Sequence, residues 1–263
     1  MEPPASLTAP SHNRILELKR TLVDHCDQCS NGYIGGINKN GTVNGAMCSC
    51  LSEVMYERNL AISNIPPKYK SAEWVNFINP TDPGFVFVNA FAGEITRARQ
   101  NGTGLHIFSE KMGAGKTLLG SCVLKAALRA GHTVWFTSVT ELLDDIRSWE
   151  NPQARERAEW AMFGVDFLML DEIEKFHNNE KGWVDDRLND LVQRRVNNIM
   201  PIISTGNVSL EQLSSKYKSH LVSRFRGTML ETYITAKVEY RIDVQRKALM
   251  SNLFNGEADP NVL

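Results

Sequence analysis

Two glycines, a lysine and a threonine stand close together in the stretch IFSEKMGAGKTLLG. Gly113 and Gly115 let backbone N–H groups approach phosphate oxygens, and the start of a helix adds its positive end to the same anion. Lys116 would neutralise the β- and γ-phosphates of a nucleotide, and the Thr117 hydroxyl would hold Mg²⁺. The full pattern G-x-x-x-x-G-K-[ST] has its first glycine where this chain has Glu110. We expect Glu110 to weaken or reshape the site without removing it, because its side chain can point outward while the backbone turns.

Two carboxylates end the apolar stretch FLMLDE. Asp171 would supply one oxygen to the Mg²⁺ shell, and Glu172 would polarise an attacking water. A strand followed by Asp-Glu is common by chance, but this pair follows the GKT loop by about fifty-five residues. The combination predicts ATP or a close nucleotide as the ligand.

Polar residues also follow the later stretch MPIISTGN, where Thr205 and Asn207 would lie at the carboxyl edge of a sheet beside the phosphates. The Asn207 amide could orient the water there. In HLVSRFRG, Arg224 and Arg226 stand on an expected helix end. An arginine in this place could complete the ATP site of a neighbouring subunit, and the alternative is a solvated surface pair.

Four of the five cysteines fall in HCDQCSNGYIGGINKNGTVNGAMCSC, as the pairs Cys26 and Cys29, and Cys48 and Cys50. The residues between them predict a hairpin with YIGGI and TV as strands and NKNG as the turn. Two cysteine pairs joined by a hairpin predict a structural zinc site that supplies much of the folding free energy of a small module. His25 could replace one thiolate, and the alternative is four free thiols in a surface loop.

Composition limits the classes that remain. With 29 Lys and Arg against 30 Asp and Glu, any contact with nucleic acid must come from a local basic stripe. The polar, proline-rich start has no signal-peptide pattern, and no run of about eighteen apolar residues appears, so we expect a cytoplasmic protein without a membrane span. The fifth cysteine, Cys122, is expected to be a small core residue on a helix.

The pattern of the chain predicts two parts. NRILELKRTLVDHC has the apolar spacing of an amphipathic helix, and the prolines of SNIPPKYKSAEW mark a boundary. We place an amino-terminal zinc-binding helical and hairpin module at residues 1–63 and an α/β domain at 64–263. In that domain, GLHIF, TVWFTS, FLMLDE and MPIISTGN are expected strands of a parallel sheet, and KTLLGSCVLKAALRAG and VTELLDDIRSW are expected helices.

From Asn64 onward the chain resembles the AAA+ ATPase domain of the DnaC/DnaI-type replicative helicase loaders of bacteria and phages, which are related to the IstB transposition helpers. The likeness runs through NIPPKYKSAEW, GAGKTLLG, GHTVWFTSVTELLDDIR, FLMLDEIEKF, LVQRRVNNIMPIISTGN and LVSRFRG. The cysteine module also resembles the helicase-binding portion of the DnaI type. The resemblance implies a P-loop AAA+ fold with ATP, Mg²⁺ and Zn²⁺ as cofactors.

The resemblance also implies roles for particular residues. Glu172, Asn207 as sensor 1 and Arg224 as the arginine finger are the implied catalytic residues. Asn207 stands in a motif that is usually TSN in the family, and here Gly206 takes the central place. The implied nucleotide-binding residues are Gly113, Ala114, Gly115, Lys116, Thr117, Leu118 and Asp171.

Loaders of this family bind single-stranded DNA through helices that follow the second strand, here ELLDDIRSWENPQARERAEW. Arg147, Arg155 and Arg157 would track phosphates, while Trp149 or Trp160 could stack on bases. The alternative for this charged helical face is simple solvation.

Four functional hypotheses follow. The first is a loader that self-associates through AAA+ interfaces, binds single-stranded DNA, opens a hexameric replicative helicase and hydrolyses ATP slowly, dependent on DNA or a partner. The second is an IstB-like transposition helper. The third is a non-catalytic helicase-binding adaptor or inhibitor, for which Glu110 is the argument. The last is a small-molecule kinase, for which no acceptor pocket or lid is indicated.

Overall fold

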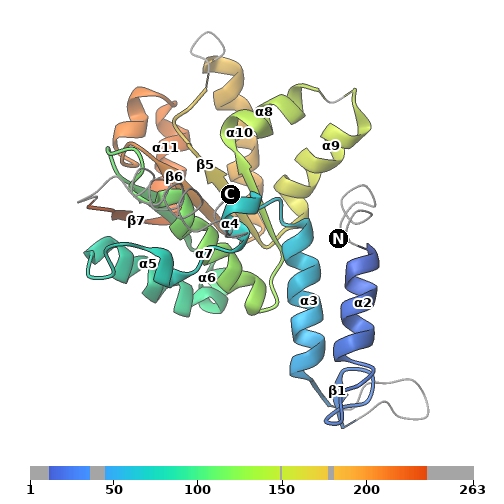
Figure 1. Cartoon of the computed structure of the whole chain (residues 1–263). Helices are drawn as coiled ribbons and strands as arrows, with labels where there is room; N and C mark the ends of the chain where they lie inside the picture. Colours follow the sequence, from blue (N-terminus) through green and yellow to red (C-terminus); the bar gives the residue numbers. More distant parts are fainter. Residues whose placement is uncertain (1–11, 36–44, 149, 177–180, 236–263) are drawn as a thin grey trace, which may run out of the picture.

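The structure is a computed structural model that describes residues 12–35, 45–148, 150–176 and 181–235. Figure 1 shows a body built on a β-sheet, with two long helices, α2 and α3, standing beside it. None of the described helices has both the length and the apolar character that crossing a bilayer requires.

The amino-terminal part consists of two helices and a small hairpin. Helix α2 (His12–Leu22) packs on α3 (Ser49–Ile62), and strands β1 (Tyr33–Ile34) and β2 (Ala46–Met47) pair antiparallel at one end of the two helices (Figure 1). The expected helix is therefore present, although it ends at Leu22, before the first cysteine, and β1 lies in the expected strand YIGGI. The expected strand TV and the turn NKNG lie outside the described residues, and the strand that pairs with β1 directly precedes Cys48.

A five-stranded parallel sheet forms the centre of the body. Its strands lie in the order β4-β5-β6-β3-β7, and every neighbouring pair is parallel. Four of them confirm the expected strands, and β7 was not expected from the sequence. The bounds are β3 (Gly104–Phe108), β4 (Val134–Ser138), β5 (Phe167–Asp171), β6 (Ile202–Gly206) and β7 (Met229–Tyr233).

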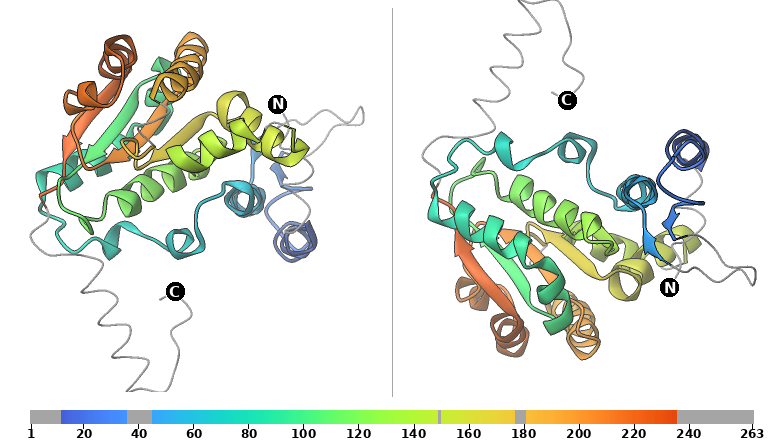
Figure 2. Two further views of the ribbon diagram at one scale, coloured as in Figure 1. Left: turned by 90° about the horizontal axis from the view of Figure 1, so that it is seen from above. Right: turned by 90° about the horizontal axis from the view of Figure 1, so that it is seen from below.

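Helices cover both faces of this sheet (Figure 2). One face carries α5 (Pro83–Gly93), α6 (Ile95–Asn101) and α7 (Lys116–Arg129), with the short α4 (Pro67–Lys70) beside α7. The other carries α8 (Val139–Arg147), α9 (Pro152–Glu159), α10 (Lys181–Asn197) and α11 (Ser219–Thr228). Short turns of other helix types lie at Trp74–Asn76, Trp160–Gly164 and Gln212–Ser215.

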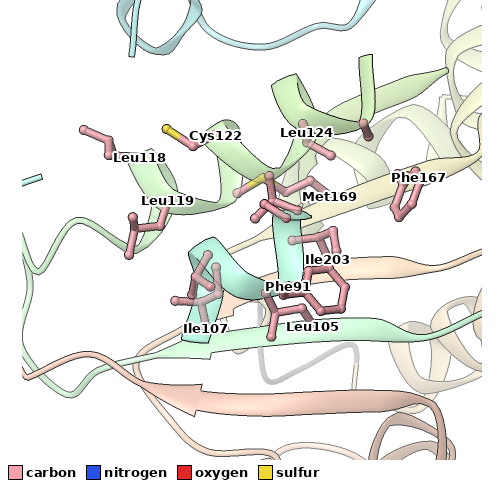
Figure 3. Packing of buried hydrophobic residues seen from close by; sticks show 14 of the residues in the cluster. Phe91, Leu105, Ile107, Leu118, Leu119, Cys122, Leu124, Phe167, Met169 and Ile203 are labelled. Carbon is pink, nitrogen blue, oxygen red and sulfur yellow. The ribbon is translucent and has the colours of Figure 1, made fainter. Parts of the chain in front are cut away.

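Buried side chains on the two faces form two apolar clusters. Figure 3 shows the first cluster, in which Leu119 of α7 faces Ile107 of β3 and Met169 of β5. The neighbours of Met169 along the strand, Leu168 and Leu170, belong to the cluster on the opposite face. Burial on both faces explains why the sequence of β5 is continuously apolar before Asp171.

Helix α3 lies between α2 and α7 and joins the two parts of the chain (Figures 1 and 2). After α3 ends, Ser63 and Asn64 bond to the edge strand β4: the Phe136 N–H donates to the Ser63 carbonyl at 2.8 Å, and the Asn64 amide donates to the Phe136 carbonyl at 2.8 Å. The Arg129 guanidinium at the end of α7 lies 4.3 Å from the centre of the Tyr56 ring on α3. The amino-terminal module is thus fixed to the helix that follows the GKT loop.

Candidate functional site

The loop between β3 and α7 has the backbone that its glycines predict. Gly113 and Gly115 have φ values of 73° and 86°, in the left-handed region that favours glycine. A Cβ atom at Gly115 would also lie 2.8 Å from the ring of Phe77, which packs against the loop. Glu110 is exposed and is not among the described non-glycine residues with positive φ, so the turn at this position does not require glycine. Its outward side chain is as expected.

Lys116, the first residue of α7, points its ammonium group at three oxygen atoms. Its Nζ donates to the Ser109 carbonyl at 3.0 Å, the Lys111 carbonyl at 3.0 Å and Asn207 Oδ1 at 2.9 Å. Burial lowers the pKa of Lys116, although the nearby carboxylates of Glu174 and Asp171 oppose this effect. The fold therefore brings Lys116 into direct contact with Asn207, which lies 91 residues later in the chain.

Asp171, at the carboxyl end of β5, accepts hydrogen bonds from two hydroxyl groups. Thr117 Oγ1 donates at 3.1 Å, and Thr205 Oγ1 of β6 donates to the same carboxylate oxygen. Burial raises the pKa of Asp171, which favours a proton or a cation on this group. The hydroxyl of Thr117 and the carboxylate of Asp171 suit Mg²⁺, which prefers oxygen ligands and would neutralise phosphate charge when bound.

Glu172 follows in a strained backbone conformation, with φ of 55°. Its backbone N–H donates to Thr205 Oγ1 at 3.3 Å, so the hydroxyl of Thr205 links both carboxylate residues to β6. The Glu172 side chain is 47% exposed, and its Oε1 lies 2.6 Å from Lys175 Nζ. The structure thus places Glu172 at the rim of the site, and its role in polarising water stays a prediction.

Asn207 follows β6 and is held by a residue that we did not predict. The backbone N–H of Asn207 donates to Glu174 Oε1 at 3.1 Å, and its side-chain Nδ2 donates to the same oxygen at 2.6 Å. Glu174 stands two residues after the predicted pair in DEIEKF, and nothing in that local pattern marks it. Its importance depends on the pairing of β5 with β6.

Among the described residues, neither arginine of α11 forms a hydrogen bond or an ion pair with the phosphate loop. Arg224 donates to the Asn189 side chain of α10, and Arg226 is exposed. The role of Arg224 as an arginine finger for a neighbouring subunit stays a prediction.

The residues expected to bind DNA differ in exposure and in their contacts. Trp160 is only 2% exposed, so its expected stacking on bases is wrong: the ring fills the core under α9. Arg157 is held by Asp145, with Nε 2.9 Å from its carboxylate, and the Arg147 guanidinium lies over the ring of Trp183. Arg155 is exposed, and Trp149 lies outside the described residues.

The four cysteines of the amino-terminal module come together at the hairpin. Their sulfur atoms all lie within 4.8 Å of one another, with Cys26 and Cys48 at 3.9 Å and Cys29 and Cys50 at 3.5 Å. A zinc–sulfur bond of about 2.3 Å in a tetrahedron places sulfurs roughly 3.8 Å apart, so the set fits Zn²⁺. His25 is exposed and outside the cluster, and Cys122 is buried on α7 as expected.

One of these thiols is electrostatically prepared to be a thiolate. The backbone N–H of Cys50 bonds to the Cys48 sulfur and is the chief cause that lowers the pKa of Cys48 to about 7. Because zinc takes thiolates, such a donor also suits a sulfur that binds the metal.

Residues 96–225 match a family model described as IstB-like ATP binding protein. The matched range begins in α6 and ends in α11, and it contains Lys116, Asp171 and Asn207. This region is an IstB-like ATP-binding domain. Its parallel sheet, flanked by helices, with a phosphate loop after β3, is the AAA+ fold.

Solved structures share the fold of the IstB-like domain. DnaI has a TM-score of 0.56 and 19% identity, over 66% of this chain and 93% of that chain. The DnaC helicase loader has a TM-score of 0.55 and 19% identity, over 64% and 99%. Domain III of the Thermotoga maritima replication initiation protein DnaA has a TM-score of 0.55 and 22% identity, over 73% and 77%. No curated protein matches the chain in sequence.

Proposed function

We propose that this protein is an ATP-dependent loader of a hexameric replicative helicase onto single-stranded DNA. The observation that carries the proposal is the joining of a four-cysteine module to an IstB-like domain through α3. The similar fold of the protein named as the DnaC helicase loader supports the same function. In this reading, residues 1–63 bind the helicase and residues 64–263 form the ATPase.

The contact between α3 and α7 offers a route from nucleotide to partner. Helix α7 begins with Lys116 at the phosphate loop and ends with Arg129, which lies over Tyr56 and 4.0 Å from Glu53 on α3. A shift of α7 on nucleotide binding would therefore move α3 and the cysteine module attached to it. Small shifts of packed helices are a common form of switching.

The residues of the site divide the work of ATP binding and hydrolysis. Lys116 and the N–H groups of the loop bind phosphates, while Thr117 and Asp171 would hold Mg²⁺. Asn207 and Glu172 orient and polarise water, and Arg224 serves the site of a neighbouring subunit in a self-associated form. Because binding energy is used to change partner geometry, we expect slow hydrolysis that increases with DNA or helicase.

A loading assay tests this function. Hexameric replicative helicases from a panel of bacteria are mixed with a single-stranded DNA circle and ATP, and retained helicase is measured after gel filtration. Wild-type protein should increase retention with one helicase of the panel, and Lys116→Ala should abolish the increase. Glu211→Ala, which removes an exposed carboxylate from the segment after Asn207, is the matched control. ATP turnover without loading of any helicase would contradict the proposal.

An IstB-like transposition helper is the second candidate, and the family model itself favours it. Such a protein would deliver a transposase to DNA and would have no need to bind a helicase. The cysteine module favours the loader. Binding of a helicase that is lost in Cys29→Ser would support the loader, and ATP-dependent DNA binding with no helicase contact would support the helper.

A helicase-binding adaptor without ATP chemistry makes a different prediction. Glu172→Gln in such an adaptor should behave like wild type. In an ATP-driven loader, Glu172→Gln should form DNA-bound assemblies that fail to release the helicase.

A further inference from the structure

Glu174 has no role in the site as predicted from the sequence, yet it contacts Asn207 directly. We propose that Glu174 is a positioning residue, which fixes the Asn207 amide so that its carbonyl oxygen faces Lys116. The inference rests on the proposed ATPase, because its readout is hydrolysis at this site. It does not depend on which partner the ATPase serves.

The hydrogen bonds leave the amide one orientation. Glu174 Oε1 accepts from the Asn207 backbone N–H at 3.1 Å and from Nδ2 at 2.6 Å, and Asn207 Oδ1 accepts from Lys116 Nζ at 2.9 Å. If the amide were turned over, its oxygen would face the carboxylate of Glu174 and its NH₂ group would face the ammonium of Lys116. Both contacts would pair like with like, an acceptor with an acceptor and a donor with a donor.

Burial makes this arrangement rigid. Glu174 is 9% exposed, and its second oxygen, Oε2, has no hydrogen-bond partner among the described residues. A buried carboxylate with one oxygen unpaired is costly, so the two bonds to the other oxygen are what hold this group in place. Asn207 donates both of these bonds.

Gly206 is the structural counterpart of Glu174. A Cβ atom at position 206 would lie 2.8 Å from Glu174 Oε2, closer than carbon and oxygen atoms approach in proteins. Any side chain there would displace the Glu174 carboxylate from its present position. The glycine at the centre of TGN therefore accommodates Glu174, and the two residues form a matched pair across β5 and β6.

The fixed amide determines what Asn207 can do chemically. When a phosphate takes the ammonium of Lys116, Asn207 Oδ1 remains directed at the site as an acceptor. It can then accept a hydrogen bond from an O–H of the attacking water and orient the water. Loss of Glu174 would let the amide turn and would slow hydrolysis more than it weakens ATP binding.

Steady-state hydrolysis and fluorescent-ATP binding by the full chain, with single-stranded DNA present, test this inference. Glu174→Ala should lower kcat about tenfold or more while the ATP Kd changes less than about threefold. Glu174→Gln should keep kcat within about threefold of wild type, because Gln Oε1 still accepts both N–H groups. Glu211→Ala is the control and should match wild type.

Two double variants separate positioning from general damage. Glu174→Ala combined with Asn207→Ala should be no slower than Asn207→Ala alone, because the first residue acts through the second. Gly206→Ala should also lower kcat, because it displaces the Glu174 carboxylate. It should lower kcat less in a protein that already carries Glu174→Ala, where only the contacts with Ile173 at 3.2 Å and His106 at 3.3 Å remain. Thermal unfolding of every variant identifies loss of folding.

The outcomes distinguish this inference from the proposed function. Hydrolysis by Glu174→Ala at the wild-type rate would overturn the inference, as would equal loss in Glu174→Gln and Glu174→Ala. Normal ATP turnover with no loading of helicase would overturn the loader alone and leave the inference supported by its kinetics. A wild-type protein that neither binds nor hydrolyses ATP would overturn both.

Discussion

Lys116 and Asp171 stand at the edge of a sheet that is buried on both faces, whereas Cys26 and Cys48 stand beside a hairpin with two described residues in each strand. In the ATP-binding domain, apolar packing fixes the strands, and the strand ends in turn fix the positions of the polar side chains of the site. In the amino-terminal module, α2 packs on α3, but no residue of β1 or β2 is buried. There, metal binding by the cysteines must stabilise the fold, as the apolar core does in the ATP-binding domain.

The comparison shows two ways to hold a functional group. A site built on a core should keep its geometry when one of its polar groups is removed, because the scaffold remains. A module closed by metal ligands should lose its fold with the ligand. Changes made in each region can therefore break or sharpen this contrast.

Removal of zinc should have the largest effect and should be confined to one region. Cys29→Ser, or treatment with a chelator, should unfold the hairpin and free α2, because structural zinc contributes about 10 kcal/mol or more to such modules. Hydrogen exchange should rise across residues 12–35 and 45–50, while α3 stays protected by its contact with α7 and the ATP Kd stays within about twofold. Metal analysis should give one zinc per chain in wild type and in Cys122→Ala, and none in Cys29→Ser.

Slow exchange in α2 and at the cysteines of the metal-free protein would contradict the contrast. It would mean that the contact between α2 and α3 is sufficient to fold the module.

Arg195 tests the opposite region, where a buried charge supports the scaffold. Its side chain is fully buried, and its guanidinium donates to the carbonyls of Ala161, Met162, Val165, Asp166 and Pro201. Burial lowers the pKa of Arg195 to about 9, yet the group stays charged at neutral pH. Arg195→Met should cost about 3–5 kcal/mol in urea unfolding, because the carbonyls lose their donors.

The neighbouring Arg194 is a matched control. It lies 2.9 Å from Asp190 on the same helix, and its side chain is 53% exposed. Arg194→Met should change the free energy of unfolding by less than about 1 kcal/mol, because exposed ion pairs contribute little. Equal costs for the two substitutions would show that burial of Arg195 does not stabilise this part of the domain.

The same contrast explains what could be read from the sequence. Lys116, Thr117 and Asp171 were predictable because a glycine loop and a strand end are local patterns whose order along the chain is informative. Glu174 was not, because its meaning comes from a neighbouring strand more than thirty residues later. Trp160 was wrongly predicted to be accessible to DNA because its neighbours in the sequence are charged. In the structure, the Trp160 side chain packs in the apolar core.

Strand β7 and helix α10 were missed for separate reasons. Strand β7 has the short sequence MLETY, in which only the first and fourth residues are buried, so its apolar pattern is weak. Helix α10 had a signal that could have been used: Val184, Leu188, Leu191 and Val192 recur at helical spacing and are all fully buried. In the amino-terminal module, the four cysteines were recognised and α3 was not.

His106 should make the stability of the ATP-binding domain depend on pH. It is buried in β3; its Nδ1 lies 2.8 Å from Ser204 Oγ, and its Nε2 lies 2.9 Å from the Val208 carbonyl. Since a carbonyl only accepts, Nε2 carries the proton and Nδ1 accepts from Ser204. Glu231 is the acidic residue in register on β7, and its carboxylate accepts from the N–H of Leu210. Burial lowers the pKa of His106 to about 4.

Between pH 6.5 and about 4, the unfolded chain binds a proton at this position that the folded chain excludes. The free energy of unfolding should therefore be highest above pH 6.5 and fall by an amount on the order of 3 kcal/mol as pH drops through this window. Urea unfolding at several pH values measures the slope, and His106→Asn should reduce it. Burial also lowers the pKa of His132, so His132→Asn shows how much of the slope belongs to the other histidine.

An NMR titration of the His106 ring in the wild-type protein provides a test that does not depend on a variant. Its signals should not shift between pH 8 and pH 5. A transition near pH 6.5 would contradict the burial argument for this site.

Substitution of Glu110, the residue that departs from the phosphate-loop pattern, should have the smallest effect. Because its backbone does not need positive φ, Glu110→Gly should not repair a distorted turn. What the substitution removes is a negative charge in an exposed position near bound phosphates, where screening by water limits the repulsion to about 1 kcal/mol or less. Glu110→Gly should therefore tighten ATP binding by about threefold or less, and the gain should shrink at high salt.

Glu110→Gln separates charge from backbone, because it removes the charge and keeps the side chain. If charge is the only difference, Gln and Gly should bind ATP equally well at every salt concentration. A glycine variant that binds at least tenfold more tightly than the glutamine variant would show that the loop is strained at this position. The apolar core would then fix the positions of Lys116 and Asp171 but not the conformation of the loop that binds phosphate. That loop would depend on bound ATP for its conformation, as the cysteine module depends on bound zinc.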